Sequence, residues 1–401
     1  MKNGWEAKKL GDVCSFLNRG VSPKYVEKGG IVVLNQRCIR DHRVSFDVAR
    51  RHDIKAKTVS DERIVQVGDV LVNSTGEGTL GRVAQIREDL PESTTVDSHV
   101  TIVRPAPGMF FTEFFGYVLR DIEEELKMSG EGCGGQTELN RKVLSERFLV
   151  RFPESLPEQQ RIVGILDKAF DGIATAKANA EKNFQNAHAL FESHLNAIFT
   201  QRGEGWVETT IGEVIRFIDY RGKTPVKTAS GIRLITAKNV KMGYLQETPM
   251  EFIASASYRG WMTRGIPQKS DVLFTTEAPL ANVAQLDTDE KVSFAQRIII
   301  MQPEKTKLDS TFLKYLLLSG PVQQRIRAKG TGATVQGIKA SLLKLIEISF
   351  PKTLTEQNQI VERLDSLNEE TQRLASLYEQ KLAALEALKK SLLHEAFSGR
   401  L

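Results

Sequence analysis

The sequence predicts an α+β protein in which two pseudo-symmetric mixed α/β domains are joined by two long helices. Two observations carry this prediction. The chain contains an internal repeat, because the segment that begins at Trp5 recurs at Trp206, an offset of 201 residues, and the segment that begins at Phe152 recurs at Phe350, an offset of 198. Each copy also passes from short β-rich runs into about forty residues rich in strong helix formers.

The mixed part of each copy contains both strand and helix patterns. IVVLNQ at 31–36 and VSFAQRIIIMQP at 292–303 are β-rich runs that turn residues separate from their neighbours. Residues 112–128 and 310–329 show apolar side chains at helical spacing. We therefore predict four segments: a mixed domain at 1–152, a helical region at 153–203, a second mixed domain at 204–350 and a second helical region at 351–401.

The two helical regions share one heptad register, which predicts an intramolecular antiparallel coiled coil. The first apolar stripe is Ile162, Leu166, Ala169, Ile173, Ala176, Ala180, Asn183, Ala187, Leu190 and His194, and the second repeats it from Ile360 to Leu392 at an offset of 198. A helix of this length spans about 60 Å. The alternative is a pair of amphipathic helices, each folded onto its own domain.

Glycines 76, 78 and 81 in GEGTLG have the spacing of a dinucleotide-binding turn. That motif requires a helix after the turn, whereas the residues that follow are short β-branched runs broken by Pro91. We interpret the glycines as a tight loop. The second copy places TTEAPLAN against NSTGEGTLG and has Ala281 at the position of Gly81, which predicts a different loop.

Composition and motifs indicate a cytoplasmic protein and contain no signature of a catalytic or metal site. The formal charge is +5, the three cysteines show no C-x-x-C spacing, and neither a membrane span nor an N-terminal leader is found. Motifs of phosphate loops, zinc proteases, serine hydrolases and amino methyltransferases are all missing. His99 aligns near Phe294 or Ala295 of the second copy and is interpreted as a structural or ligand-facing residue.

The doubled chain resembles the DNA specificity subunits of type I restriction-modification enzymes over its whole length. The motifs that carry this resemblance are the W-x4-[LI]-G-[DE]-V openings at Trp5 and Trp206, YRGKTP at 220–225, TTEAPLANVAQ at 275–285, AQR at 295–297, and the Glu-Gln pairs at 158–159 and 356–357. Each motif is degenerate alone, and their order and duplication make the match specific.

The resemblance implies a function and a set of partners. Each mixed domain would be a target recognition domain that reads one half of a bipartite, asymmetric sequence in double-stranded DNA. The helix pair would set the separation of the domains and dock two modification (methyltransferase) subunits. Restriction/translocase subunits would join them. The resemblance implies no cofactor in this subunit and no membrane partner; S-adenosylmethionine, ATP and Mg would belong to the partner subunits.

Exposed polar residues in the matching loops are the candidate DNA contacts, because Arg and Lys suit phosphate or guanine and Asn and Gln suit adenine. Arg221 and Arg297 are the first candidates. In the first domain the candidates are Asn18, Arg19, Lys24, Gln36, Arg37, Asn73, Ser74, Thr75, Glu77, Arg82, Gln136 and Arg141. In the second domain they are Tyr220, Arg221, Lys223, Lys238, Asn239, Thr276, Glu277, Arg297, Lys329, Thr331 and Gln336.

Two other functions fit parts of the sequence. A stand-alone DNA-binding regulator would use both domains without catalytic partners. A scaffold protein would use the coiled coil to organise a complex and the paired domains to bind protein. Loop residues in general are also often solvated or held in structural ion pairs, so a base contact is one of several possible roles for each candidate.

Overall fold

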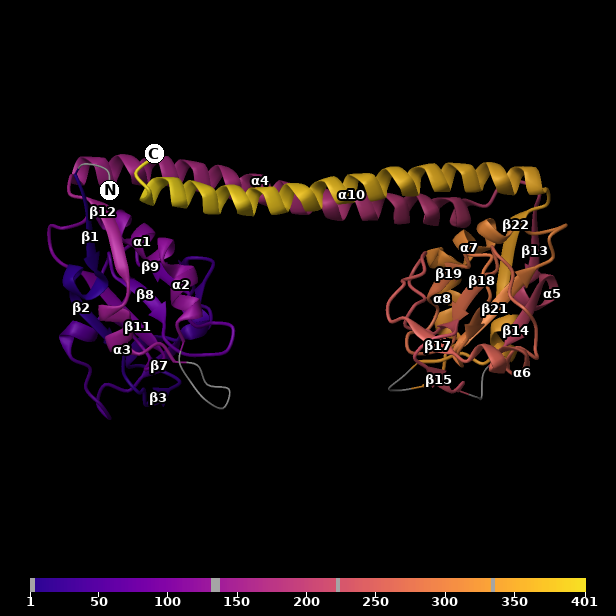
Figure 1. The fold of residues 1–401 in the computed structure, drawn as a ribbon, viewed down its shortest axis with the longest axis horizontal. Coiled ribbons are helices and arrows are strands. Elements are labelled where there is room, and N and C mark those ends of the chain that lie inside the picture. Colours follow the sequence, from indigo (N-terminus) through magenta and orange to yellow (C-terminus); the bar gives the residue numbers. More distant parts are fainter. Residues whose placement is uncertain (1–3, 131–137, 221–223, 333–335) are drawn as a thin grey trace. The chain divides into compact units, whose positions relative to one another are not determined.

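The chain divides into two compact units, each made of one mixed domain and parts of both long helices (Figure 1). The computed structural model describes residues 4–130, 138–220, 224–332 and 336–401. The first unit comprises 1–179 and 381–401, and the second comprises 180–380. The divisions fall inside α4 (Leu156–Gln201) and α10 (Leu354–Phe397), so each long helix contributes to both units.

The first unit contains two four-stranded sheets and three smaller helices. The first sheet is antiparallel, with the order β2 (Cys14–Arg19), β11 (Val100–Pro105), β8 (Val70–Asn73) and β9 (Val83–Gln85). The second has the order β10 (Thr94–Val96), β4 (Ile31–Leu34), β7 (Arg50–His52) and β3 (Tyr25–Val26), with β10 and β4 parallel. β1 (Trp5–Lys9) pairs with β12 (Leu149–Pro153), and β5 (Ile39–Arg40) pairs with β6 (Arg43–Val44). The helices are α1 (Thr112–Asp121), α2 (Glu123–Met128) and α3 (Arg141–Glu146), with short 3-10 turns η1 (Leu10–Val13), η2 (Gln36–Cys38) and η3 (Asp61–Arg63).

The second unit repeats this sheet order. Its antiparallel sheet is β14 (Ile215–Asp219), β21 (Ile298–Pro303), β18 (Val272–Thr275) and β19 (Val283–Gln285). Its mixed sheet is β15 (Lys227–Thr228), β17 (Glu251–Ile253), β16 (Ile232–Ile235) and β20 (Val292–Phe294), and β13 (Trp206–Thr210) pairs with β22 (Glu347–Pro351). The helices are α5 (Ile211–Val214), α6 (Tyr258–Trp261), α7 (Ser310–Leu318), α8 (Gly320–Ala328) and α9 (Ala340–Lys344), with the 3-10 turn η4 (Ser255–Ser257). The predicted α+β class and duplication are confirmed.

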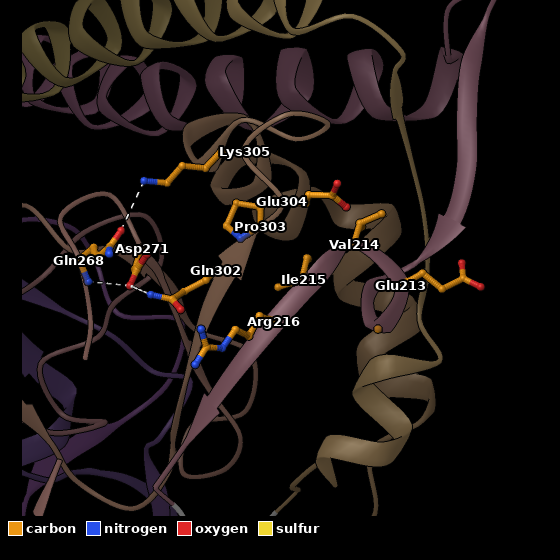
Figure 2. A pocket seen from close by; sticks show the side chains of 11 residues that line it. Glu213, Val214, Ile215, Arg216, Gln268, Asp271, Gln302, Pro303, Glu304 and Lys305 are labelled. Carbon is orange, nitrogen blue, oxygen red and sulfur yellow. Dashed lines mark hydrogen bonds between the residues drawn. The ribbon is translucent and has the colours of Figure 1, made fainter. Parts of the chain in front are cut away.

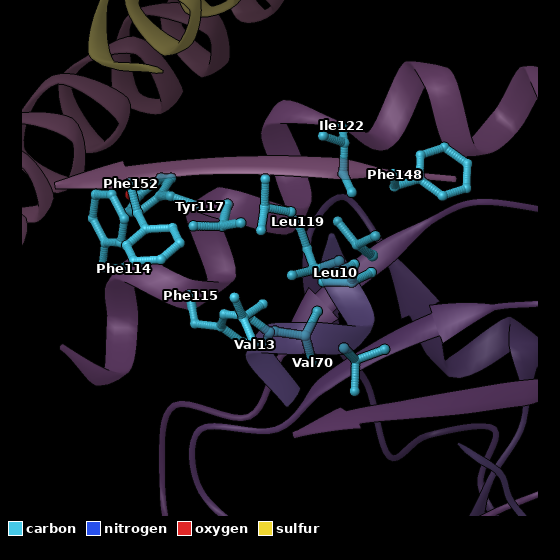
Figure 3. Close-up of a cluster of buried hydrophobic side chains, with 14 of the residues drawn as sticks. Leu10, Val13, Val70, Phe114, Phe115, Tyr117, Leu119, Ile122, Phe148 and Phe152 are labelled. Atoms are coloured by element: carbon cyan, nitrogen blue, oxygen red, sulfur yellow. The ribbon is translucent and has the colours of Figure 1, made fainter. Parts of the chain in front are cut away.

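The antiparallel sheet of each unit is buried on both faces. In the first unit Val70 and Val72 point into a core beneath α1 and α4, part of which Figure 3 shows, while Leu71 between them joins a second core with the mixed sheet. In the second unit Phe274 and Leu273 divide in the same way. Because neighbouring side chains of a strand point to opposite faces, burial on both faces explains why these strands are apolar without alternation.

Each core is completed by a second helix segment, which comes from the far end of the chain in the first unit and directly precedes the domain in the second unit. Phe397, near the end of α10, lies 5.4 Å from Phe114 of α1, measured between ring centroids. In the second unit Phe199, near the end of α4, lies 5.4 Å from Phe312 of α7. The segment 381–401 therefore closes the core of the first domain, and residues 180–201 close the core of the second.

The long helices pair in antiparallel fashion, as predicted. In the first unit Arg161 Nη2 donates to the Leu401 carbonyl at 2.8 Å, and Lys177 Nζ lies 2.7 Å from Glu386 Oε1. Residue numbers therefore rise along α4 while they fall along the paired part of α10. In the second unit Leu195 of α4 and Leu364 of α10 belong to one apolar cluster.

The predicted apolar stripe is wrong at single positions in the last third of each helix, whereas Ala187, Leu385 and Leu392 of the same stripe are buried or half-buried as predicted. Leu190 and Leu388, which the stripe would bury, are 53% and 46% exposed, whereas the next residues along, Phe191 and Lys389, are half-buried. An α-helix drifts by about 20° per heptad against a strict seven-residue repeat, so after about four heptads the buried face has moved by nearly one residue.

The glutamine of each Glu-Gln pair anchors a mixed domain to its long helix. Gln159 is fully buried; its Oε1 accepts from the Phe111 N–H at 2.7 Å, and its Nε2 donates to the Pro153 carbonyl at 2.8 Å. Gln357 accepts from the Asp309 N–H at 2.8 Å and donates to two carbonyls, those of Lys307 and Pro351, at 2.8 Å each. Both glutamines satisfy backbone groups that would otherwise be buried without partners.

The loops that start at Gly76 and at Glu277 end in the same backbone conformation despite their different sequences. Gly81 has φ +77° and donates its N–H to Asn73 O at 2.8 Å. Ala281 has φ +68° and donates its N–H to Thr275 O at 2.8 Å. The expectation that Ala281 changes the loop is wrong at this position, because surrounding contacts hold alanine in a left-handed conformation that costs about 1 kcal/mol.

Replacing either anchoring glutamine by leucine is expected to destabilise its own unit by about 3 kcal/mol. The leucine leaves a buried N–H and buried carbonyls without partners, at about 1 to 3 kcal/mol each. Thermal denaturation of Gln159→Leu and Gln357→Leu measures the loss. Glu158→Gln, which changes a half-buried neighbour paired with Arg161, is the control and should melt nearly like the wild type. Equal melting of all four proteins would contradict the anchoring role.

Gly81→Ala is expected to destabilise the first unit by about 2 kcal/mol or more, through overpacking and the positive φ. A Cβ atom at Gly81 would lie 2.6 Å from the backbone nitrogen of Lys127 in α2, which cannot move without shifting the helix. The reverse change, Ala281→Gly, should alter the stability of the second unit by about 1 kcal/mol or less, since relief of strain offsets the lost methyl contact. Chemical denaturation of both variants tests this asymmetry.

Candidate nucleic-acid interface

The two antiparallel sheets present matching loops at the end where β8 and β18 finish, and we call this region the loop edge of each unit. The first loop edge comprises residues 18–19, 73–82, 99 and 138–141, and the second comprises 219–220, 275–282, 296–297 and 331–338 as far as they are described. Two backbone bonds hold the first frame: Ser74 N–H donates to His99 O at 2.8 Å, and Leu139 N–H donates to Ser74 O at 2.8 Å.

The second loop edge has the same frame. Thr276 N–H donates to Arg297 O, and Ile338 N–H donates to Thr276 O, both at 2.9 Å. Isolated bridges then pair Thr75 with Glu138 in the first unit and Glu277 with Gly337 in the second. The correspondence of these bonds identifies equivalent positions in the two units without reference to sequence alignment.

Polar side chains of the first loop edge contact one another. Thr75 Oγ1 hydrogen bonds with His99 Nδ1 at 2.7 Å. Arg19 Nη2 lies 2.7 Å from Glu138 Oε1, and Arg141 Nη1 donates to Asn18 Oδ1 at 2.8 Å. The edge therefore carries three arginines, Arg19, Arg82 and Arg141, of which Arg19 forms an ion pair with a carboxylate.

The second loop edge carries a different set of side chains. Arg297 Nε lies 2.9 Å from Glu277 Oε1, and both side chains are nearly half exposed, at 47% and 45%. Thr224 donates a hydrogen bond to Gln296, which precedes Arg297. Thr331 forms a bridge with Gly337. The cation of this edge, Arg297, therefore lies at the exposed end of the hydrogen-bonded frame.

The structure places the predicted contact residues in three groups. Those that are exposed or half-buried are Asn18, Arg19, Lys24, Gln36, Arg37, Thr75, Glu77, Arg82, Arg141, Lys238, Glu277, Arg297, Lys329, Thr331 and Gln336. Those that are buried are Asn73, Ser74, Tyr220, Asn239 and Thr276. Gln136, Arg221 and Lys223 lie outside the described residues. Lys24 stands apart from the loop edge, because its backbone N–H donates to His52 of the mixed sheet.

The buried candidates hold backbone in place. Asn73 Nδ2 donates to Gln36 O at 3.0 Å. Asn239 Oδ1 accepts from Thr236 N–H at 3.0 Å, while its Nδ2 donates to the Pro249 carbonyl at 2.9 Å. These hydrogen bonds position the loops around both side chains, while Asn73 Oδ1 is buried without a hydrogen-bond partner among the described residues.

Tyr220 and Ser74 act in the same manner. The Tyr220 hydroxyl donates to Gly265 O at 2.7 Å and accepts from the Arg264 N–H at 3.1 Å, and burial raises the pKa of this phenol. Ser74 Oγ hydrogen bonds with Thr101 Oγ1 at 2.5 Å. Both side chains tie strands of one sheet to adjoining segments.

His99 is a loop-edge residue that the sequence interpretation left out of the candidates. Its sequence alignment with Phe294 or Ala295 is wrong, because the backbone bonds show that His99 of the first unit is equivalent to Arg297 of the second. The offset of 198 residues that relates Phe152 to Phe350 also relates His99 to Arg297, so the correct alignment was already present in the sequence. The sequence signal that could have identified His99 was the match between DSH at 97–99 and AQR at 295–297.

A cavity of about 520 Å³ lies at the opposite end of β14 and β21 from the second loop edge (Figure 2). At its wall Asp271 Oδ2 accepts from the Gln302 amide at 2.8 Å and from the Gln268 N–H at 2.7 Å. Burial raises the pKa of Asp271, and these two hydrogen bonds lower it in part. The first unit has an ion pair in the same place.

In the first unit Asp69 is neutralised by Arg104, whose Nε lies 2.8 Å from Asp69 Oδ1. Arg104 also stacks over the ring of Phe16 at 5.5 Å. In the second unit the strand partners at these positions are Gln302 and Arg216, so the cation has moved to the neighbouring strand. The cavity is consistent with this replacement of a long guanidinium by a shorter amide.

Neither a metal-ligand cluster nor a membrane-spanning helix occurs among the described residues. Within 4–130, 138–220, 224–332 and 336–401, no group of three or more His, Cys, Asp or Glu side chains is placed to hold a metal ion. No helix in these ranges combines the length and the apolar character that crossing a membrane requires.

Comparisons with known proteins agree on one family. The family model of the type I restriction modification DNA specificity domain matches residues 2–182 and 203–386. The type I restriction enzyme EcoKI specificity subunit of Escherichia coli (strain K12) is 25% identical over 206 residues, which are 49% of this chain and 44% of that protein. The chain thus matches less than half the length of this relative.

Two further comparisons cover nearly the whole chain. The type I restriction enzyme MjaVIII specificity subunit of Methanocaldococcus jannaschii is 21% identical over an aligned length of 421 residues, which covers 99% of this chain and 93% of that protein. A chain solved in a study of complex assembly and conformational transition of the type I R-M system has a TM-score of 0.80 at 18% identity, covering 100% of this chain and 99% of its own. The latter likeness concerns the fold.

Asp271, whose burial outweighs its two hydrogen bonds and the nearby charge of Lys305, is expected to make the second unit less stable as the pH rises. Its folded pKa lies above the unfolded value, so its unfavourable contribution is absent below the unfolded pKa and reaches its full size above the folded pKa. Asp271→Asn should therefore raise the melting temperature at pH 7 and change it less at pH 4.

Asp69→Asn is the matched control in the first unit and should have the opposite sign. Removing one partner of the buried ion pair with Arg104 leaves an unpaired cation, at a cost of about 3 kcal/mol. Melting curves of both variants between pH 4 and pH 8 test the pair. Stabilisation by both substitutions, or by neither, would contradict this assignment of charge.

Proposed function

The chain belongs to the type I restriction modification DNA specificity family, and we propose that it recognises a bipartite, asymmetric DNA sequence as the specificity subunit of a type I restriction-modification complex. The observation that carries this proposal is the pair of loop edges, which share one backbone frame and carry different exposed side chains. Two equivalent readers with different side chains suit a target whose halves differ in sequence.

We propose that residues 1–152 and 204–350 are the two target recognition domains, with helical regions at 153–203 and 351–401. The exposed loop-edge residues would contact phosphates and base edges, while the buried ones hold the frame. Double-stranded DNA is the ligand, because a major groove presents a distinct pattern of donors, acceptors and methyl groups for each base pair.

The catalytic steps are assigned to partner subunits. In this proposal the chain is non-catalytic and holds no cofactor; two modification (methyltransferase) subunits use S-adenosylmethionine, and restriction/translocase subunits use ATP and Mg. The complex would act in the cytoplasm, where its DNA substrate lies. The paired helices α4 and α10 offer the docking surface for these partners.

Selection of the full-length chain against a random duplex library tests this function. We expect enrichment of two fixed half-sites separated by a spacer of unspecified sequence. A single contiguous or palindromic motif would favour a stand-alone regulator. Failure to retain any duplex in the presence of heparin would favour a scaffold and would overturn the proposal.

Arg141→Ala is expected to weaken binding to the selected duplex and to lower the salt slope of binding by about one unit, as loss of a phosphate contact does. Arg141 is exposed at the first loop edge. The control is Arg373→Ala, which removes an equally exposed arginine paired with Glu370 on α10, outside the loop edge. Filter binding at several salt concentrations measures both variants, and an unchanged slope for Arg141→Ala would remove this residue from the interface.

A further inference from the structure

The strongest difference between the two units lies at one pair of equivalent positions. Residue 75 and residue 277 each follow directly on the buried end of the frame, and residues 99 and 297 each supply the carbonyl that closes it. In both units the side chain of the first position contacts the side chain of the second. The first unit places Thr75 against His99, and the second places Glu277 against Arg297.

The frame beneath each pair is rigid, whereas the pair itself is accessible. The side chains of Ser74, Thr275 and Thr276 are at most 3% exposed. By contrast, His99 is exposed, and Arg297 and Glu277 are nearly half exposed. A polar pair that stands on buried strand ends is held in one place while its outer atoms remain available to a ligand.

The third side chain at each edge also differs. In the first unit Glu138, which bridges to Thr75, forms an ion pair with Arg19. In the second unit the equivalent residue is Gly337, and a Cβ atom there would lie 3.3 Å from Glu277 Cβ. The glycine leaves Glu277 the room that it occupies beside Arg297.

The backbone at Arg297 is strained. Its φ is +148°, a conformation that residues with a side chain rarely adopt. Backbone strain of this kind persists where surrounding contacts impose it, and it gathers at ligand-binding positions. Here the Thr276 N–H and the Glu277 carboxylate hold Arg297 from two sides.

The two pairs present different hydrogen-bonding patterns. A guanidinium is a planar fork of donors that matches the O6 and N7 acceptors of guanine, and a carboxylate on Nε fixes the plane of that fork. An imidazole held by a hydroxyl has no such fork, and each ring nitrogen acts singly. The two units would therefore prefer different bases at the equivalent place in their half-sites.

We propose that Glu277–Arg297 and Thr75–His99 are the specificity-determining pairs of the two units, and that Arg297 reads a guanine in the half-site of the second unit. This inference rests on the proposed function. It adds which residues discriminate and what one of them recognises. Arg297 contacts the base, and Glu277 is a positioning residue that acts through it.

The test exchanges the pair of the second unit for that of the first. Full-length E277T/R297H is selected against the same random duplex library as the wild type. The exchange removes one positive and one negative charge, so the attraction to phosphates is conserved to first order. We expect one guanine in one half-site to lose about tenfold or more of its preference. The other half-site, read by the unaltered first unit, is the internal control.

Two single variants guard the result against misfolding. R297K keeps the charge and loses the fork, so we expect wild-type salt dependence with loss of the guanine preference. H99Q alters the first unit and should change the opposite half-site alone. Each variant is scored on the sequence of both half-sites.

Outcomes for this inference differ from those for the function itself. A wild-type chain that enriches no bipartite motif overturns the function. A wild-type bipartite motif that E277T/R297H and R297K leave unchanged in both halves overturns the inference and leaves the function standing. Altered preference in the half-site that the first unit reads would also overturn the inference.

Discussion

Each mixed domain closes its apolar core against two antiparallel helix segments, and in the first unit one of these comes from the far end of the chain. In the first unit the core beneath α1 includes Ile162 and Leu166 of α4 together with Phe397 of α10. Burying a phenylalanine side chain contributes about 1.5 to 3 kcal/mol, so the unit depends on the last turns of the chain. The repeated structural unit is therefore formed once by residues 381–401 together with 1–179, and once by the continuous segment 180–380.

Polar contacts also fix each domain on its helix pair. Beside the anchoring glutamines, Tyr117 donates a hydrogen bond to Asp167 of α4, and Tyr315 donates one to Asp365 of α10. Burial and the neighbouring carboxylate raise the pKa of Tyr117 to about 12 and raise that of Tyr315 as well, so both phenols stay protonated as donors at neutral pH. A domain fixed at several points presents its loop edge in one orientation to its helices.

The sequence was sufficient for the fold class, the duplication and the helix pair, because these depend on long apolar patterns that recur. It was insufficient for details that depend on three dimensions. The stripe failed at Leu190 and Leu388 because helical drift accumulates with length. Ala281 was expected to alter its loop, yet neighbouring contacts hold it at a positive φ as they hold Gly81.

The candidate contact residues show the same limit. By residue type alone, Asn239, Tyr220 and Arg297 are equally plausible as polar loop residues that contact DNA. Their burial and hydrogen bonds show that Asn239 and Tyr220 instead bind backbone groups. His99 was missed because it was aligned with Phe294 or Ala295, whereas both the closing backbone bonds and the 198-residue offset of the repeat relate it to Arg297. Sequence can propose polar loop residues, but the division between frame and tip requires the hydrogen-bond pattern.

That division between frame and tip also explains how one fold can carry two sequence preferences. The frame is made of buried strand ends such as Asn73 and Thr275, where a substitution would leave polar groups unsatisfied and cost stability. The tips are exposed pairs, and exchange of exposed side chains usually alters stability by less than about 0.5 kcal/mol. Specificity can therefore change at the tips while the core, the helix pair and the anchoring glutamines stay the same. Net charge carries no such information, because the excess of +5 attracts any nucleic acid alike, and only the placement of single cations such as Arg297 distinguishes one sequence from another.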